Sequence, residues 1–497
     1  MNRIGHKLMN AWVSLGPRFL PFADVATRDL PLSRLLRLSL FQVSVGMSLV
    51  LLVGTLNRVM IVELGVSAAL VGIMVSLPLV FAPFRALIGF RSDTHRCELG
   101  WRRVPFIWNG TLLQFGGFAI MPFALLVLGG KLEAAHAPLW IGQASAGLAF
   151  LLVGAGVHTV QTAGLALATD LTPVESHPKV VGLMYVMLLA GMIVSALVFG
   201  AALVEFSPGR LVQVIQGVAV VTVLLNVTAM WKQETRRPIR GGVAPPRDPT
   251  FAESWASFCE GEHVIRRLVV VGIGTMAFGM ADILLEPFGG QVLHFTVSET
   301  TKLTALLALG GLLGFGFASR VLSRGADPYR MTQAGALVGL PAFALVIVAA
   351  PLGVPGLFLI GNFLIGFGGA LFGHGTLTAT MSRAPKHQAG LALGAWGAVQ
   401  ATGAGLGMAL SGTIRDVVNA ALGAAQGPSG FAGAASGYVA VYGLEIALLL
   451  VTLVASIPLI RHAARSPVDE SPGDLGLVLD AVPTGPQAAD SRGGSGP

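Results

Sequence analysis

The sequence predicts an all-α integral membrane protein with twelve transmembrane helices in two groups of six and both termini in the cytoplasm. The 497-residue chain is 54% hydrophobic and 11% charged, whereas soluble domains carry about 25% charged residues. Apolar runs of about 20 residues, long enough to cross a bilayer as a helix, recur along the chain. Lys and Arg gather in alternate loops, and this pattern sets the orientation.

The apolar runs divide the chain into two bundles. Six predicted helices occupy 35–57, 66–88, 104–128, 139–166, 180–204 and 211–230, and six more occupy 267–288, 302–319, 331–350, 355–378, 390–413 and 438–460. The predicted domains are an N-terminal segment (1–33), an N-terminal bundle (34–231), a connector (232–265), a C-terminal bundle (266–460) and a tail (461–497).

The segments outside the bundles are polar. The tail is rich in Pro, Gly, Ser and Asp, which predicts disorder. Within the N-terminal segment, Ile4, Leu8, Trp12 and Leu15 share one helical face. This pattern fits a short helix lying on the inner leaflet, and a flexible segment fits equally well.

Most of the 32 basic residues lie in the two terminal segments, the connector and the loops that share their side of the membrane. The opposite side has Arg58, Lys131, Arg210, Lys302 and Arg415. Because cytoplasmic loops carry the excess of Lys and Arg, both termini are expected to be cytoplasmic. The basic residues form no continuous face, which argues against nucleic-acid binding.

The loop after the second predicted helix, "GFRSDTHRCELGWRR" (89–103), concentrates charge in a chain that has little of it. Six helices, a cytoplasmic connector and six more helices resemble the major facilitator superfamily. In that superfamily this loop carries a glycine, an aspartate and a basic cluster that latch the cytoplasmic side closed. The matching residues are Gly89, Asp93, Arg96, Gly100, Arg102 and Arg103. Extra residues between Asp93 and Gly100 depart from the usual spacing, and a plain topology signal is the alternative.

A second pair of related segments, "ATDLTPVESHPKVVGL" (168–183) and "TATMSRAPKHQAGLAL" (378–393), follows the fourth helix of each half. Such internal repetition is expected of a two-halved transporter fold.

A narrower resemblance rests on three segments: "LRLSLFQVSVGMSLVLLVGTLNRVMIVELGV" (36–66), "LGWRRVPFIWNGTLLQFGGFAIMPFALL" (99–126) and "FGMADILLEPFGGQVL" (278–293). They resemble the PucC/LhaA family, the bacteriochlorophyll-delivery branch of the superfamily, and overall the chain is closer to the LhaA side. The resemblance implies a non-enzymatic assembly factor for light-harvesting antenna complexes, with the core antenna LH1 favoured over the peripheral antenna LH2.

The same resemblance implies cargo, partners and location. The cargo is bacteriochlorophyll, with carotenoid as a further pigment, or a nascent antenna polypeptide. The partners are antenna α and β polypeptides, the reaction centre–antenna complex or chlorophyll synthase. The location is the bacterial inner membrane and its intracytoplasmic extensions.

Ionisable groups inside spans are costly and therefore mark candidate sites. Asp282 and Glu286 lie four residues apart, on one face of the seventh predicted helix, and Pro287, Gly289 and Gly290 are expected to interrupt that helix. Arg58 ends the first helix at a similar depth, so we expect it to pair with one of these carboxylates. The alternative places all three in water at the headgroups. Arg85 lies one turn before Gly89 and either snorkels to the surface or joins the latch.

A chlorophyll magnesium accepts one axial ligand, often a neutral imidazole. His158 and His374 lie inside predicted spans, and Gln161 lies on roughly the same face as His158. Each is a candidate pigment ligand, although a lone membrane histidine more often bonds another helix. The two cysteines are too few for a metal cluster, so magnesium would be bound only as part of the pigment.

Two other function classes remain open. A secondary transporter would rock around a central small-molecule site, and sparse intramembrane charge disfavours ion coupling. A pigment-modifying enzyme is disfavoured because no nucleophile–base set stands out.

Overall fold

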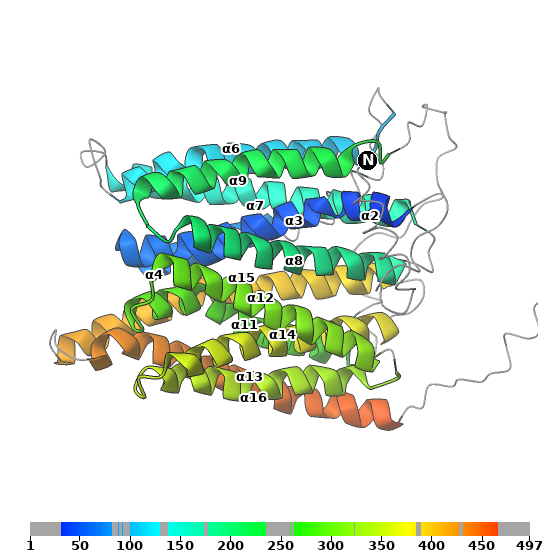
Figure 1. The fold of residues 1–497 in the computed structure, drawn as a ribbon. Helices are drawn as coiled ribbons and strands as arrows, with labels where there is room; N and C mark the ends of the chain where they lie inside the picture. The colour runs from blue at the N-terminus through cyan, green and yellow to red at the C-terminus, as the bar shows by residue number, and fades with distance from the viewer. Residues whose placement is uncertain are drawn as a thin grey trace, which may run out of the picture.

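The computed structural model describes residues 31–81, 88, 92, 100–129, 138–172, 177–234, 259, 263–322, 324–383, 389–426 and 431–465. All regular elements in these ranges are helical, which confirms the all-α class. Figure 1 shows the long helices running side by side, with the helices of the N-terminal half in one layer and those of the C-terminal half in the other. The predicted interfacial helix and most of the connector and tail lie outside the described residues.

The first half of the chain has a winding that the sequence did not predict. Its elements are α2 (Leu32–Leu38), α3 (Leu40–Leu49), η2 (Val50–Leu56), η3 (Val59–Glu63), α4 (Ala68–Ser76), η4 (Leu77–Phe81), α6 (Val104–Leu128), α7 (Leu139–Asp170), α8 (His177–Ala202) and α9 (Pro208–Met230). The elements α2 to η3 form one continuous apolar span, Leu32–Glu63. In η2 and η3 this span is wound as a π-helix, a rare form that is frequent at functional sites.

The second half of the chain contains α11 (Val264–Gln291), α12 (Val297–Leu322), α13 (Pro328–Ala349), α14 (Pro355–Arg383), α15 (Ala389–Gln426) and α16 (Phe431–Arg465). The predicted break at Pro287, Gly289 and Gly290 is wrong, because α11 continues through Pro287 to Gln291. Several helices also run past the predicted bounds, α15 and α16 most of all.

Within the described ranges, 10 helices are long and apolar enough to cross a membrane. The chain is therefore a multi-pass membrane protein. The remaining two predicted spans coincide with α4 and α15. The described part of α4 is short, and α15 is rich in Gly, Ala, Ser and Thr, which lowers its hydropathy. The count of twelve and the orientation of the termini stay predictions.

The halves meet along two helix pairs, α8 with α12 and α4 with α15. Glycine allows the second pair to approach closely: a Cβ on Gly72 would lie 2.6 Å from the Met408 carbonyl oxygen. Small residues play this part in membranes, where backbone contact replaces the hydrophobic driving force. The same pair is held by Asp416, whose carboxylate accepts the Ala69 backbone N–H at 2.7 Å. On the other pair, the Ser298 hydroxyl donates to the Gly200 carbonyl oxygen at 2.6 Å.

A polar bridge between the halves explains why α11 tolerates Pro287. Proline has no N–H, so the carbonyl four residues earlier, that of Ile283, loses its helical donor. The side-chain amide of Asn57 donates to this oxygen at 2.9 Å. Asn57 belongs to the first span and is fully buried. The N-terminal half therefore satisfies a backbone group that α11 cannot satisfy itself.

We expect Asn57→Leu to lower the free energy of unfolding by about 1–2 kcal/mol, because the Ile283 carbonyl is left without a donor. In a Pro287→Ala background the alanine N–H supplies the helical bond, and the same substitution should cost less. Thermal or SDS unfolding of the four proteins measures this coupling.

Asn362→Leu is the matched control. The buried Asn362 amide donates to the Leu303 carbonyl oxygen at 2.8 Å, away from the proline. Its cost should be equal in both backgrounds. An Asn57→Leu cost that does not depend on residue 287 would contradict the bridge.

Candidate functional site

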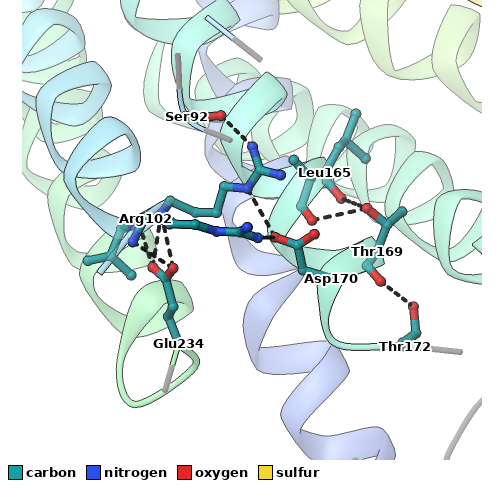
Figure 2. A network of polar contacts seen from close by, with 10 residues as sticks. Ser92, Arg102, Leu165, Thr169, Asp170, Thr172 and Glu234 are labelled. Atoms are coloured by element: carbon teal, nitrogen blue, oxygen red, sulfur yellow. Dashed lines mark hydrogen bonds and ion pairs between the residues drawn. The ribbon is translucent and has the colours of Figure 1, made fainter. Parts of the chain in front are cut away.

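A network of charged side chains lies at one end of the N-terminal half (Figure 2). Arg102 Nη2 and Arg103 Nε both reach Asp170 Oδ2, at 2.7 and 3.0 Å. Arg103 Nη1 also donates to Ser92 Oγ at 2.5 Å. Asp170 is the last residue of α7, so these contacts fasten the loop before α6 to the end of its neighbour.

Glu234 caps the start of α6 in the same network. Its carboxylate accepts the backbone N–H groups of Arg102 at 2.7 Å, Arg103 at 3.0 Å and Val104 at 3.0 Å. The first N–H groups of a helix have no helical partner, and a negative charge is stabilised there. Arg34 Nε donates a hydrogen bond to Oε1 of the preceding residue, Gln233, at 3.0 Å. The chain entering the first span and the chain leaving α9 are thus tied together.

Part of the predicted latch lies in this network. Gly100 has a φ of +80°, a conformation that glycine adopts without strain. Arg102 and Arg103 join α6 to α7 within one half, so their ion pairs stiffen the N-terminal half internally. Gly89, Asp93, Arg96 and Arg85 lie outside the described residues.

The sequence interpretation missed two members of the network. Asp170 stands in the segment 168–183 that has a counterpart in the second half, and an acid at a helix end beside a basic loop was a usable signal. Glu234 left no such signal, because only the fold brings it back to Arg102 and Arg103, about 130 residues earlier in the chain.

The prediction that Arg58 pairs with Asp282 or Glu286 is wrong. Arg58 forms an ion pair with Glu63, and its Nη2 donates to the Phe295 carbonyl oxygen at 3.2 Å. The five-residue spacing of this pair matches the i→i+5 hydrogen bonds of a π-helix, whereas the prediction rested on the similar depth of Arg58 and the two α11 carboxylates. The expected meeting of the first span with α11 is confirmed, because α11 contacts η2 and η3.

The carboxylates on α11 have other surroundings. Glu286 is 4% exposed, and its Oε1 accepts the Thr304 hydroxyl at 2.9 Å. Asp282, one turn earlier, is half-buried. On α16, Glu445 is fully buried and was not singled out from the sequence. The rule that ionisable residues inside spans mark sites applied to it equally.

His158 and His374 occupy equivalent places in the two halves: each is the twentieth residue of its helix, α7 and α14 respectively. His158 is 8% exposed. The ring of His374 meets the edge of Phe315 at 4.5 Å between centroids, and its Nδ1 has no hydrogen-bond partner. Gln161 is buried and donates weakly to Gln42, at 3.4 Å. Its amide is therefore turned toward α3.

A shallow apolar groove lies on the N-terminal half between η3, α6 and α9. Its walls include Val59, Leu64, Pro122, Phe206 and Leu211, and Glu63 lies at its edge. Within the described ranges, no group of three His, Cys, Asp or Glu residues has an arrangement that holds a metal ion.

Comparison with known proteins gives one family and one fold. The family model described as "PUCC protein" matches residues 55–464. Protein PucC of Rhodovulum sulfidophilum is 64% identical over 420 residues, which cover 84% of this chain and 92% of that protein. A more distant relative, 29% identical over 87% of this chain and 97% of its own length, is named bacteriochlorophyll synthase 44.5 kDa chain, from Rhodobacter capsulatus.

Among solved structures, a variant of the nucleoside transporter NupG aligns with a TM-score of 0.64 at 14% identity, covering 85% of this chain and 99% of that one. At this identity the match establishes a transporter-like fold and nothing about substrate.

The Arg58–Glu63 pair predicts the outcome of a charge exchange. Arg58→Glu should lower the free energy of unfolding by roughly 2 kcal/mol, because it places two carboxylates together in a largely buried site. Adding Glu63→Arg should recover part of this loss, as measured by thermal unfolding in detergent. Adding Glu286→Arg instead should recover none, and recovery there would restore the pairing first expected from the sequence.

The Asp170 network predicts unequal roles for two neighbouring arginines. Arg103 is 5% exposed in its side chain and Arg102 is 36% exposed. Arg103→Gln should therefore cost about 1–2 kcal/mol of stability and Arg102→Gln less than about 1 kcal/mol. In an Asp170→Asn background, Arg103→Gln should lower the free energy of unfolding by less than it does in the native protein. Equal melting temperatures for the two single variants would argue against the buried pair.

Proposed function

Because the chain belongs to the PUCC protein family, we propose that it is a non-enzymatic membrane assembly factor for bacterial light-harvesting antenna complexes. It would deliver bacteriochlorophyll to nascent antenna polypeptides or stabilise them before assembly. The family match carries the proposal, because it runs from the end of η2 to the end of α16 and includes two of the three segments that resemble this branch, with the last part (55–66) of the first.

The physical need for such a factor supports the proposal. Bacteriochlorophyll and antenna helices are both too apolar to cross water, so their transfer requires a membrane-embedded surface. The groove between η3, α6 and α9 is apolar and open, which suits the tail of a pigment, a carotenoid or the side of a helix.

His158 and His374 could bind the magnesium ion at the centre of the pigment ring. His374 offers a ring nitrogen without a partner beside Phe315, and a neutral imidazole is a common axial ligand for magnesium. His158 stands at the equivalent place in the other half. We propose His374 as the first candidate, followed by His158. Gln161 ranks third, because its amide faces Gln42.

The partners and location follow from the same function. We propose antenna α and β polypeptides as direct partners, with the reaction centre–antenna complex or chlorophyll synthase as larger assemblies. The core antenna LH1 is favoured over LH2, as expected from overall resemblance to the LhaA side. The protein would span the inner membrane and its intracytoplasmic extensions twelve times, with both termini in the cytoplasm.

A second candidate function, secondary transport of a small molecule, is favoured by the fold alone. The chain aligns over most of its length with a nucleoside transporter. Such a protein would move a solute across vesicles, whereas an assembly factor would copurify with pigment or antenna subunits.

Deletion of the protein should deplete a light-harvesting complex while bacteriochlorophyll synthesis continues. Absorption spectra of whole membranes measure this and separate the LH1 band from the LH2 band. Loss of LH2 alone would redirect the proposal to the peripheral antenna. An intact antenna, together with purified protein that carries neither pigment nor antenna polypeptide, would reject assembly altogether.

Replacing His374 and His158 by Phe, singly and together, tests the ligands. We expect pigment occupancy of the purified protein to fall most in the double variant, by several-fold. His294→Phe is the matched control, because His294 lies beyond the end of α11. Unchanged occupancy in the double variant would leave packing alone to hold the pigment.

A further inference from the structure

Four polar side chains of α11 and α16 gather inside the C-terminal half. Glu445 and Tyr442 lie one turn apart on α16, and Glu286 and Asp282 lie one turn apart on α11. The two helices pack against each other, and the Phe288 ring meets Tyr442 at 5.7 Å between centroids. This contact places the Tyr442 turn of α16 beside the part of α11 that carries Glu286.

Asp282 is half-buried, whereas the other three side chains of this cluster have buried polar atoms without a hydrogen-bond partner among the described residues. Glu445 and Tyr442 are both 0% exposed. Both carboxylate oxygens of Glu445, the Tyr442 hydroxyl and Glu286 Oε2 have no hydrogen-bond partner. One donor, the Thr304 hydroxyl, reaches the cluster, at Glu286 Oε1.

Neither nearby guanidinium forms an ion pair with these acids: Arg58, which lies against Gly290 one turn after Glu286, pairs with Glu63. Arg415 pairs with Asp416 at 2.7 Å, donates to Gln291 and lies over the Tyr438 ring. Tyr438 is two turns before Glu445 on α16, about 10 Å along the helix axis. Tyr438 itself donates to Gln291 at 2.7 Å. Within the described ranges, no Lys, Arg or His forms an ion pair with Asp282, Glu286 or Glu445.

An isolated carboxylate in an apolar interior is strongly unfavourable, and neighbouring carboxylates cannot all ionise together. Such acids stay neutral by holding a proton, or their charge is balanced by a bound metal ion. A divalent metal ion needs several oxygen ligands in close array, and the described residues contain no group of three His, Cys, Asp or Glu arranged to hold one.

We propose that Glu445, Glu286 and Asp282, with the Tyr442 hydroxyl, form a proton-binding site inside the membrane. Glu445 is the principal acceptor, because neither of its oxygens has another partner. The site also touches the contact between the halves: Glu286 holds Thr304, and Thr304 lies against Gly54 of the first span. Proton occupancy thereby acts on the surface where the two halves meet. This inference does not depend on the antenna role.

Modification by dicyclohexylcarbodiimide tests the proposal on the purified full-length protein. This apolar reagent reacts with protonated carboxyl groups: the acid proton moves to a reagent nitrogen and the carboxylate oxygen bonds to the central carbon. Rearrangement then leaves an N-acylurea that carries the whole reagent, and peptide mass spectrometry locates it.

We expect label on Glu445 or Glu286 that declines several-fold as pH rises and does not change with added Na⁺, K⁺ or Ca²⁺. Glu299 is the matched control, because it is exposed and its carboxylate holds the Thr296 N–H and hydroxyl. It should stay unlabelled. Loss of labelling when a metal ion is added at fixed pH would overturn the proposal in favour of a metal site.

An infrared difference spectrum between the native protein and Glu445→Gln covers the case in which the reagent cannot enter. A protonated carboxyl has a C=O stretch separate from that of a carboxylate, and the glutamine variant should lose this band. The band without the label supports the proposal, whereas absence of both refutes it.

Discussion

The packing of the two halves depends on one backbone carbonyl, that of Ile283 in the C-terminal half, which has no hydrogen-bond donor within its own helix. Pro287 deprives the Ile283 carbonyl of its helical donor, and the bilayer core has no water to replace it. Asn57 of the first span supplies the missing donor. The bond crosses from one half to the other, so the N-terminal half stabilises the backbone of α11 at the point where Pro287 removes a helical hydrogen bond.

The contacts around this bridge follow from the same shortage of water. Gly72 lets α4 approach the backbone of α15, and Asp416 accepts a backbone N–H at the start of α4. Arg58 donates to a backbone carbonyl after α11 and pairs with Glu63. These contacts lie toward the end of the bundle opposite the Arg103–Asp170 network. One end is thus joined between halves, and the other is fastened within the N-terminal half.

Charge is distributed unequally between the halves. In the N-terminal half, Arg103, Asp170 and Glu234 satisfy one another at the bundle end (Figure 2). In the C-terminal half, Glu286 and Glu445 are buried with oxygens that lack donors. Paired charges stabilise an end of the bundle, whereas a buried acid without a partner is costly in its ionised form. The pseudo-symmetry of the helices therefore does not extend to their chemistry.

The sequence by itself determined the all-helical membrane class, the positions of the helices and the family resemblance, because hydropathy and local motifs are properties of neighbouring residues. It also identified Glu286 and His374 as unusual residues within apolar runs. Only the tertiary structure decided which partners they meet. The partner of Arg58 changed because the first span is wound as a π-helix, and Glu234 joined α6 across a long sequence separation. The Ile283 carbonyl, freed by Pro287, is bonded by Asn57, which lies in another helix. The Glu234 and Asn57 contacts arise when distant segments pack, and no local pattern encodes them.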